Sequence, residues 1–463
     1  MNVNVAKFGG SSLANAKQIK KVGQIVKENK RRKFIVVSAP GKRHDHDDKI
    51  TDLLIKIGEN YINNDSYDEY LTTVLNRFSG IINNLQLPEQ LFKDIKTSMQ
   101  TALKYVTPGY LDPIKAIGED SCAKIVTAYL NTLDVEAVYL NPKDAGIVVS
   151  DNPGDAQILP NSCKQLNQLR HHHEVMVIPG FFGYTQSNRL MTFSRGGSDI
   201  TGSIVAAGVK ADLYENFTDV DSVYAVNPNI VNQPSTIDTL TYKEMRELSY
   251  AGFSVFHDEA LIPAFKANIP VCIKNTNNPT AKGTMIVSHK KPTERCIVGI
   301  ASDIGFCSLY VSKYLMNREL GFGRKLFQIL EDECISFEHA PSGIDDMSII
   351  LREHQLTDEK EKTILFRIKN ELAVDTVKIE RNLAMIMIVG EGMKHTTGMA
   401  QKATTALTNA NVNIEMINQG SSEVSMMFGI KDKQLKQAVQ ALYNVFFKNN
   451  NWCMKKTYFH NGV

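Results

Sequence analysis

A short pattern near the amino-terminal end constrains the fold more than any other part of the chain. Residues 3–8 alternate apolar side chains as a β-strand does, Gly9 and Gly10 follow, and apolar residues then recur at helical spacing over 13–26. Residues 33–40, "KFIVVSAP", form a β-branched apolar run that is typical of a strand buried on both faces. Strand, glycine turn, helix and buried strand make a right-handed βαβ unit, which predicts an α/β sheet.

The totals exclude several classes of protein. With 463 residues the chain is too long for one ordinary domain, and its 43% hydrophobic and 22% charged residues are typical of a globular protein. A formal net charge of +2 gives no reason to expect a nucleic-acid or membrane partner. Seven cysteines without a CxxC pair favour reduced thiols, and no metal site is predicted. Without an apolar secretion signal or a run of about 20 apolar residues, a cytoplasmic location is expected.

The α/β domain is expected to cover residues 1–290. Its helical patterns between about 45 and 110 predict a helical insertion. Further strands are expected at 135–140, 174–183, 211–220 and 269–276. The polar segment 288–295 contains a proline and is interpreted as a linker.

Beyond this linker the sequence repeats itself. Moving the segment that starts at Gly321 forward by 77 residues aligns it without gaps on the segment that starts at Gly398. Lys325 and Lys402 coincide, as do Glu338 and Glu415. Each copy predicts strand, glycine turn, helix, strand, turn and strand. Two copies of a small α+β module favour a paired regulatory or binding unit, with modules at 298–378 and 380–457.

The glycine turn after the first strand is a candidate anion site. Bare amides at a helix start suit a phosphate, although this signal alone is weak. The turn does not match the G-x-G-x-x-G of dinucleotide sites or the P-loop pattern. Lys7 precedes it at the carboxyl end of the strand, where ligands of open α/β sheets bind. A solvated lysine beside an ordinary turn is the alternative.

Two later segments combine charge with turns. In "FSRGGSDITG" (193–202), Arg195 offers a bidentate fork for a carboxylate, and two glycines lead into a helix with Asp199 in its first turn. Helix capping would explain Ser198 and Asp199 but not Arg195. The segment "TDVDSVYAVNP" (218–228) is either an acidic hairpin turn or the edge of a nucleotide site with an aromatic against the base.

These motifs, in this order, resemble those of the aspartokinases in the amino-acid kinase superfamily. The resemblance rests on "KFGGSS", "VVSAPGKR" with "KITDLL", "GED" at 118, "FSRGGSD" and "TDVDSVYAVNP", and the repeat, with "NVNIEMINQGSSEVS", resembles tandem ACT domains. It covers essentially the whole chain. It implies a three-layer αβα kinase domain followed by two ferredoxin-like ACT domains. The implied reaction is phosphoryl transfer from ATP, with Mg²⁺, to the side chain of L-aspartate, the first step toward lysine, threonine and methionine.

The resemblance also assigns roles to residues. It places Lys7 at the transferred phosphoryl group, Asp199 as the group that organises the transfer, Glu119 at the ammonium of aspartate and Arg195 at a carboxylate. The residues implied to bind aspartate are Ser38, Thr51, Glu119, Arg195 and Ser198. Those implied to bind ATP are Lys7, Gly9, Gly10, Ser11, Thr218, Asp219 and Tyr224.

By the same resemblance the first ACT copy binds an end-product amino acid at a subunit interface, in a homodimer or tetramer. The implied effector residues are Met316, Gly321, Phe322, Gly323, Glu338 and Ser342. An acid at Glu338 favours lysine, because a buried ammonium needs a counter-charge. The helical insertion and the lack of a fused dehydrogenase also favour lysine over threonine. Because Glu338 has a twin in Glu415, it could instead belong to the exposed face of the module.

The sequence departs from the family pattern at two places. Asn229 stands where an arginine is usual after the acidic turn, and Ser254 stands where many members carry a lysine. Lys274 is a possible substitute cation near ATP. Two alternatives stay open: a kinase acting on glutamate or acetylglutamate, and a catalytically weak amino-acid sensor. Two histidine-bearing segments, 170–174 and 42–49, are interpreted as a solvated strand entry and an exposed mobile loop rather than as metal sites.

Overall fold

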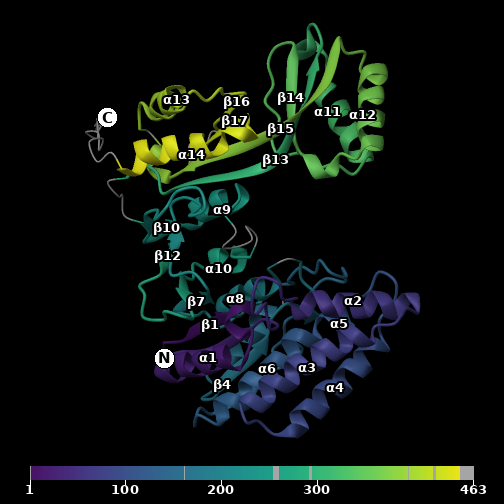
Figure 1. The fold of residues 1–463 in the computed structure, drawn as a ribbon, viewed down its shortest axis with the longest axis vertical. Helices are drawn as coiled ribbons and strands as arrows, with labels where there is room; N and C mark the ends of the chain where they lie inside the picture. Colours follow the sequence, from purple (N-terminus) through teal and green to yellow (C-terminus); the bar gives the residue numbers. More distant parts are fainter. Residues whose placement is uncertain are drawn as a thin grey trace. The chain divides into compact units, whose positions relative to one another are not determined.

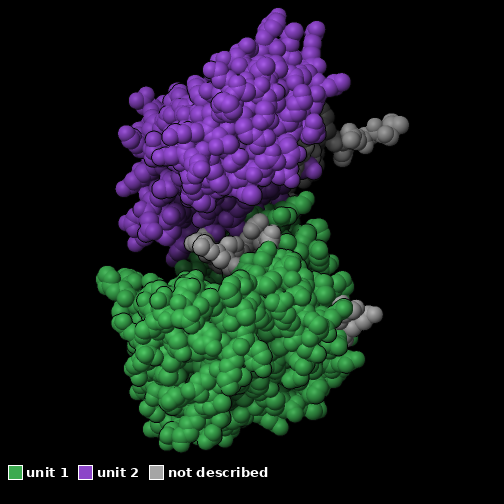
Figure 2. All heavy atoms as spheres, turned by 90° about the vertical axis from the view of Figure 1, so that its right-hand side faces the viewer, with its two compact units in different colours: residues 1–223, 236–246, 254–290 green, residues 224–235, 247–253, 291–463 purple. Residues whose placement is uncertain are grey.

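The computed structural model describes residues 2–160, 162–194, 196–253, 260–290, 295–394, 396–420 and 424–448. The chain divides into two compact units, coloured separately in Figure 2. Unit 1 comprises residues 1–223, 236–246 and 254–290, and unit 2 comprises 224–235, 247–253 and 291–463.

A mostly parallel sheet forms the centre of unit 1 (Figure 1). Within the described residues it has eight strands in the order β10-β12-β11-β7-β1-β2-β4-β3, and the β11–β12 pair is antiparallel. The strands are β1 (Asn4–Phe8), β2 (Arg32–Val37), β3 (Ala137–Tyr139), β4 (Val175–Pro179), β7 (Leu213–Thr218), β10 (Thr239–Thr241), β11 (Val271–Asn275) and β12 (Thr284–Val287). The predicted α/β sheet and its βαβ start are therefore confirmed.

Helices pack on both faces of this sheet. On one face, Ala6 and Phe8 of β1 join a large core with the apolar sides of α1 (Ala16–Glu28) and α6 (Ile117–Asn131). On the other face, α8 (Gly197–Gly208) contacts β1, β2 and β7. The remaining elements of this part of the chain are α5 (Asp112–Lys115), α7 (Ser162–Leu169), the hairpin strands β5 (Phe182–Tyr184) and β6 (Leu190–Thr192), β8 (Val223–Tyr224), β9 (Thr236–Ile237), α9 (Tyr242–Tyr250) and α10 (Ile262–Lys266).

The predicted helical insertion consists of three consecutive helices that pack on one another and extend the α1–α6 layer (Figure 1). They are α2 (Ile50–Asn63), α3 (Asp68–Asn84) and α4 (Glu89–Leu103). Their apolar stripes are buried in the same core as α1 and α6, because Leu54, Phe78 and Met99 all belong to it. The insertion is therefore part of the core of unit 1.

Unit 2 is built on one antiparallel sheet. Its described strands run in the order β14-β13-β15-β17-β16, and β13 (Gly299–Ser312) and β15 (Thr376–Val389) are each 14 residues long. The edge strands are β14 (Asp346–Arg352) and β16 (Met416–Asn418), and β17 (Ser425–Lys431) lies between β15 and β16. The helices of the unit are α11 (Phe322–Asp332), α12 (Asp358–Glu371), α13 (Met399–Asn409) and α14 (Leu435–Tyr443).

The internal repeat is visible in the backbone. Gly321 and Gly398 precede α11 and α13 in the same left-handed conformation, with φ of 79° and 83°, which glycine adopts without strain. The two copies differ in the strand after the helix. The second copy forms β16, whereas in the first copy His339 makes only an isolated bridge with Ile350. The predicted strand at this point of the first copy is therefore wrong, although the copies share their turns and helices.

Among the helices of the described ranges, none is both long enough and apolar enough to cross a membrane.

Candidate active site

The loops that follow the central strands meet at one edge of the unit 1 sheet. The Gly9 amide donates to the carbonyl of Phe217 at 3.0 Å, and the Ser38 amide donates to the carbonyl of Phe8 at 3.1 Å. The turns after β1, β2 and β7 therefore lie side by side at the carboxyl edge, where open α/β sheets bind ligands.

Lys7 and Asp199 form an ion pair at this edge. Lys7 Nζ lies 2.6 Å from Asp199 Oδ1, and the two side chains are 8% and 18% exposed. Asn216, which is paired with Lys7 in the register of β1 and β7, donates from Nδ2 to the same carboxylate oxygen. An added Cβ on Gly9 would lie 3.5 Å from Lys7 Nζ, so the ammonium stands beside the glycine turn. One fixed cation is therefore held at the turn by a carboxylate from α8.

The turn before α8 places Asp199 at the edge. Gly196 has a φ of 75°, and Phe181, on the adjacent turn, has a φ of 76°, which is unusual for an aromatic residue. The Phe181 amide donates to Thr201 Oγ1 at 3.0 Å, which ties the two turns together. Gly180 is required here, because an added Cβ would lie 2.7 Å from Ser198 Cβ. The predicted site residue Ser198 is thus packed against the turn after β4.

Glu119 is a buried carboxylate in the first turn of α6. The residue is 4% exposed, and its Oε2 has no hydrogen-bond partner among the described residues. Burial raises the pKa of Glu119 to about 8, although the backbone amides of Ala39 and of Glu119 itself favour the ionised form. Such a group is suited to receive a cationic ligand, because an ammonium would supply both the counter-charge and the missing donor.

Two glycine turns touch through their backbones. The Gly41 amide donates to the carbonyl of Gly10 at 2.9 Å, and an added Cβ on Gly41 would lie 2.6 Å from the carbonyl carbon of Gly10. Ser12 is also fixed, because its hydroxyl lies 2.7 Å from that of Thr276, after β11. The amides of Gly10 and Ser11, predicted to bind phosphate, are therefore held between two neighbouring segments.

The remaining residues that the sequence analysis singled out for the kinase site fall into four groups. Ser38 and Thr51, at the carboxyl end of β2 and the start of α2, are both half-buried. Thr218 ends β7 and donates to the exposed Asp219 at 3.1 Å. Tyr224 belongs to unit 2, so its position relative to this edge is not described. Arg195 and Ser254 lie outside the described residues.

The segment 42–49 is exposed, as its composition predicts, at every residue except Asp47. Asp47 is 8% exposed and accepts hydrogen bonds from the side chains of Arg43 and Arg77. A buried, paired carboxylate explains the position of this acid without a metal, and no group of three or more metal-ligating side chains occurs within the described ranges. The other segment conforms to its prediction, because residues 171–173 are exposed just before β4.

The predicted effector residues lie in unit 2 at the start of α11 and beside β14. An added Cβ on Gly321 or Gly323 would meet no atom within 4 Å, so the space next to both is open. Phe322 is buried in the core with Met316, which leaves their backbones as the groups that a ligand can reach. Ser342 is exposed.

The carboxylate of Glu338 is already engaged within unit 2. It accepts from Arg352 Nε at 3.1 Å and from the hydroxyl of Tyr250. Its twin, Glu415, accepts instead from Asn413 at 2.9 Å. The two acids therefore share a place in the repeat but have different partners.

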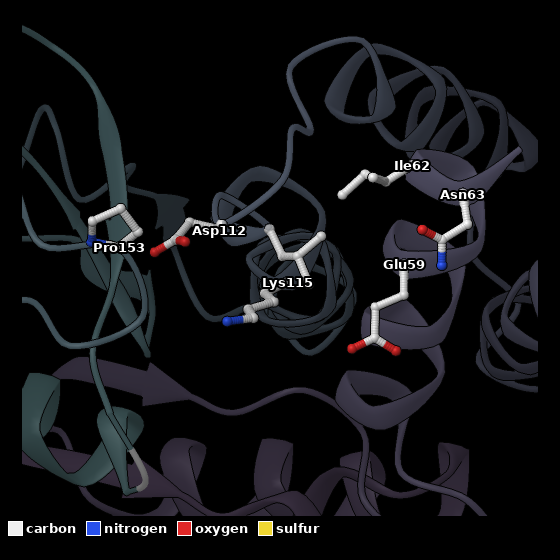
Figure 3. Close-up of a pocket in the computed structure, with 8 residues that line it drawn as sticks. Glu59, Ile62, Asn63, Asp112, Lys115 and Pro153 are labelled. Atoms are coloured by element: carbon white, nitrogen blue, oxygen red, sulfur yellow. The ribbon is translucent and has the colours of Figure 1, made fainter. Parts of the chain in front are cut away.

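A cavity of about 380 Å³ opens between α2 and α5 in unit 1. Figure 3 shows Glu59 and Asn63 on one side of it and Asp112 and Lys115 on the other. Asp112 accepts from the backbone and the hydroxyl of Thr192 at 2.6 and 2.8 Å. This acid therefore anchors β6, and the cavity contains none of the predicted site residues.

Sequence reasoning missed Asn216. It is 3% exposed in a strand covered on both faces, where a polar side chain needs a partner. That signal was available in "LYENFT", because an asparagine inside a buried parallel strand, next to the acidic turn, marks a polar contact. Asn275 was missed in the same way; it donates to Asp221 at 2.8 Å and so fixes the acidic turn.

Comparison with known proteins identifies the family of this chain. Residues 2–275 match the model of the amino acid kinase family, and residues 386–446 match that of an ACT domain. The first match defines the class of the protein. The chain is 55% identical over 448 residues to aspartokinase 3 of Bacillus subtilis (strain 168), which covers 96% of this chain and 99% of the relative. The chain therefore belongs to the aspartokinases within the amino acid kinase family.

Solved structures give the same result. The aspartate kinase of Clostridium acetobutylicum has a TM-score of 0.85 and 39% sequence identity, over 96% of this chain and 100% of that one. Aspartokinase III of E. coli, solved with aspartate and ADP, has a TM-score of 0.78 over 96% of this chain and 100% of that one. At 24% identity the second likeness supports the fold.

Proposed function

We propose that this chain transfers the γ-phosphoryl group of ATP to the side-chain carboxylate of L-aspartate, giving 4-phospho-L-aspartate. The observation that carries the proposal is the Lys7–Asp199 pair of 2.6 Å at the glycine turn on the carboxyl edge of the sheet. The 55% identity to a curated aspartokinase supports the choice of substrate.

The chemistry requires charge neutralisation rather than proton removal. A side-chain carboxylate has a pKa of about 4 and is ionised at neutral pH, so it needs no general base. The obstacle is the approach of an anion to a polyanion. Lys7 supplies a fixed positive charge at the turn, and the backbone amides after Gly9 supply further donors. Asp199 orients that ammonium and Asn216 in turn holds the Asp199 carboxylate, which makes Asp199 an organising residue rather than a proton acceptor.

The two substrates would be held by different segments of the edge. Glu119 would bind the ammonium of aspartate, with Ser38, Thr51, Arg195 and Ser198 around its carboxylates. The amides of Gly10 and Ser11 would cradle phosphate, and Thr218, Asp219 and Tyr224 would bind the nucleoside. Asn229 and Ser254 replace an arginine and a lysine that are usual in the family, so two cations near ATP would be missing. Lys274 on β11 is the proposed substitute for this lost positive charge.

Magnesium would enter with ATP. Mg²⁺ is usually bound by one or two carboxylates together with substrate phosphates, so the triphosphate would supply part of its ligands. The ion would offset part of the phosphate charge. The protein would add the charge of Lys7 on the side of the glycine turn.

The direct test is an assay with ATP in which the acyl phosphate is trapped as a hydroxamate. Aspartate, glutamate and acetylglutamate are compared as acceptors. Turnover with aspartate alone supports the proposal, whereas preference for either other acceptor would replace it with a different amino acid kinase. No turnover with any acceptor, together with retained amino-acid binding, would identify a sensor.

We further propose that free L-lysine inhibits the enzyme by binding in unit 2. The open backbone beside Gly321 and Gly323 supports a site there, and Glu338 would face the side-chain ammonium. Because Glu338 pairs with Arg352, the ligand would share or replace this partner. A coupling of about 1–3 kcal/mol would change substrate affinity about 5–150-fold.

The prediction is that Glu338→Gln weakens inhibition by lysine at least about fivefold, since the counter-charge is lost. The matched control is Glu415→Gln, which removes the same group from the twin position and should leave inhibition unchanged. Lysine and threonine titrations of the hydroxamate assay measure both variants. Equal effects of the two substitutions, or inhibition by threonine alone, would exclude the role of Glu338.

Assembly through the ACT unit is also proposed. Several large apolar side chains of unit 2 are exposed in the single chain, and Leu320 is 95% exposed. Exposed apolar residues in such number are typical of an interface between subunits. We expect light scattering to give the mass of a homodimer or tetramer, and Leu320→Lys to shift that mass downward. A mass of one chain at micromolar concentration would contradict the proposal.

A further inference from the structure

The turn after β2 contacts both halves of the candidate active site. Gly41 touches Gly10 backbone to backbone, as described above, and an added Cβ on Gly118 would lie 2.7 Å from Ala39 Cβ. Glu119 follows Gly118, and the Ala39 amide hydrogen-bonds its carboxylate. The position of residues 39–41 therefore sets the position of the phosphate turn and of the Glu119 carboxylate together.

A buried arginine from the helical insertion holds this turn. Arg77 of α3 is 6% exposed and donates from Nη1 to the carbonyl of Gly41 at 3.0 Å. Its Nη2 lies 2.7 and 2.6 Å from the two carboxylate oxygens of Asp47. Arg43 donates to the same carboxylate from its backbone and from its side chain. The loop 41–48 is thus closed on itself by Arg43 and fastened to α3 by Arg77.

The alternative is that Arg77 only stabilises the fold. A buried ion pair is weak support for stability, because desolvation of both charges offsets most of their attraction. A hydrogen bond to the Gly41 carbonyl, in contrast, defines a position, because Gly41 itself belongs to the 39–41 turn that touches Gly10 and Gly118. Side chains that hold reacting groups in place affect turnover strongly, since a displacement of about 1 Å can cost about 100-fold.

We infer that Arg77 and Asp47 are positioning residues for phosphoryl transfer, through which the helical insertion holds the 39–41 turn against the phosphate turn and the aspartate site. This inference rests on the proposed function. It gives the insertion a role in catalysis beyond its share of the core, although α3 contributes no residue that touches the proposed substrates.

The test compares Arg77→Met with a matched control elsewhere in the same core. Arg32 forms an equally buried pair with Glu215 at 2.7 Å, where β2 begins rather than where it ends. Both substitutions remove a buried guanidinium and both should lower the melting temperature. We expect kcat to fall roughly 10–100-fold in Arg77→Met but less than about threefold in folded Arg32→Met.

Further variants separate positioning from folding. Arg77→Lys keeps the positive charge but loses the guanidinium that contacts Gly41 and Asp47 together. Its kcat should lie between those of the parent and Arg77→Met. Gly41→Ala displaces the same turn directly, so its effect on kcat should be non-additive with that of Arg77→Met. If Arg77→Met does not fold, Asp47→Asn tests the same tether with a neutral side chain of similar volume. Equal kcat losses in Arg77→Met and Arg32→Met, or full additivity with Gly41→Ala, would overturn the inference.

Hydrogen–deuterium exchange makes the test independent of the proposed substrate. The Gly41 amide donates to the Gly10 carbonyl, so loss of the tether should expose both segments. Peptides spanning 38–48 and 9–13 should exchange faster in Arg77→Met than in the parent, whereas in Arg32→Met they should exchange at the parent rate. Unchanged exchange in both peptides would overturn the inference. If the parent phosphorylated no amino acid, the proposed function would fall, while the exchange result would still decide whether Arg77 holds the turn.

Discussion

Lys7→Ala is expected to lower turnover roughly 10²–10³-fold, the scale of losing one preorganised charge-stabilising donor. The ammonium is buried beside the glycine turn and held by Asp199, whose carboxylate also accepts from Asn216, so it needs no reorganisation when negative charge develops. The loss should appear in kcat with little change in aspartate affinity, because Lys7 meets the transferred phosphoryl group. Steady-state kinetics in the hydroxamate assay measure both parameters.

A suitable control for this variant is Lys21→Ala on α1. Lys21 also hydrogen-bonds through its ammonium, to Asn277 Oδ1 at 2.6 Å, but from a solvent-facing helix. Its loss should leave turnover near the parent value. A Lys7→Ala enzyme within a few-fold of the parent, with its fold intact by circular dichroism, would exclude the proposed role of the ammonium.

Glu119→Gln is expected to raise the dissociation constant of aspartate by about 30-fold or more. Truncating one partner of a buried charge pair costs about 2 kcal/mol or more, which corresponds to that factor. Succinate supplies the internal control, because it carries both carboxylates of aspartate but no ammonium. The variant should therefore bind aspartate and succinate almost equally, and calorimetry measures both. Undiminished preference for aspartate would contradict the assignment of Glu119.

The same substitution, which should weaken aspartate binding, should make the free energy of unfolding less sensitive to rising pH. Burial raises the folded-state pKa of Glu119 to about 8, above its ordinary value of 4.5. Between these two values the folded protein keeps a proton that the unfolded chain releases. The contribution of Glu119 to the free energy of unfolding is therefore fully present below about pH 4.5 and is lost as the pH rises through about 8. Glu119→Gln should flatten this fall in the free energy of unfolding, measured by urea denaturation across that range without aspartate.

The sequence allowed the composition of the site to be predicted better than its geometry. Lys7, Asp199 and Glu119 were identified because each stands in a motif that follows a strand or begins a helix. That Lys7 meets Asp199, 192 residues away, depends on the pairing of β1 with β7 and on the packing of α8. Neither local spacing nor periodicity contains that information.

Two details that the sequence did not predict have the same physical origin. The segment 42–49 is exposed as expected except at Asp47, which is buried because Arg77, 30 residues away, supplies its counter-charge. The sequence marks Asn216 as a buried polar side chain that needs a partner, but it does not identify that partner as Asp199. In both cases a polar side chain is explained by a tertiary partner, and hydropathy patterns do not report such partners.

The division of the repeat into modules remains a prediction, and the sheet of unit 2 bears on it. The first half of β13 pairs with the second half of β15, and the second half of β13 pairs with the first half of β15. A cut between residues 378 and 380 would pass through β15, so the first fragment would keep β13 whole but only the first residues of β15. Grafting one copy into another protein would therefore divide β15, and an insertion at this point would disturb the pairing of β15 with β13.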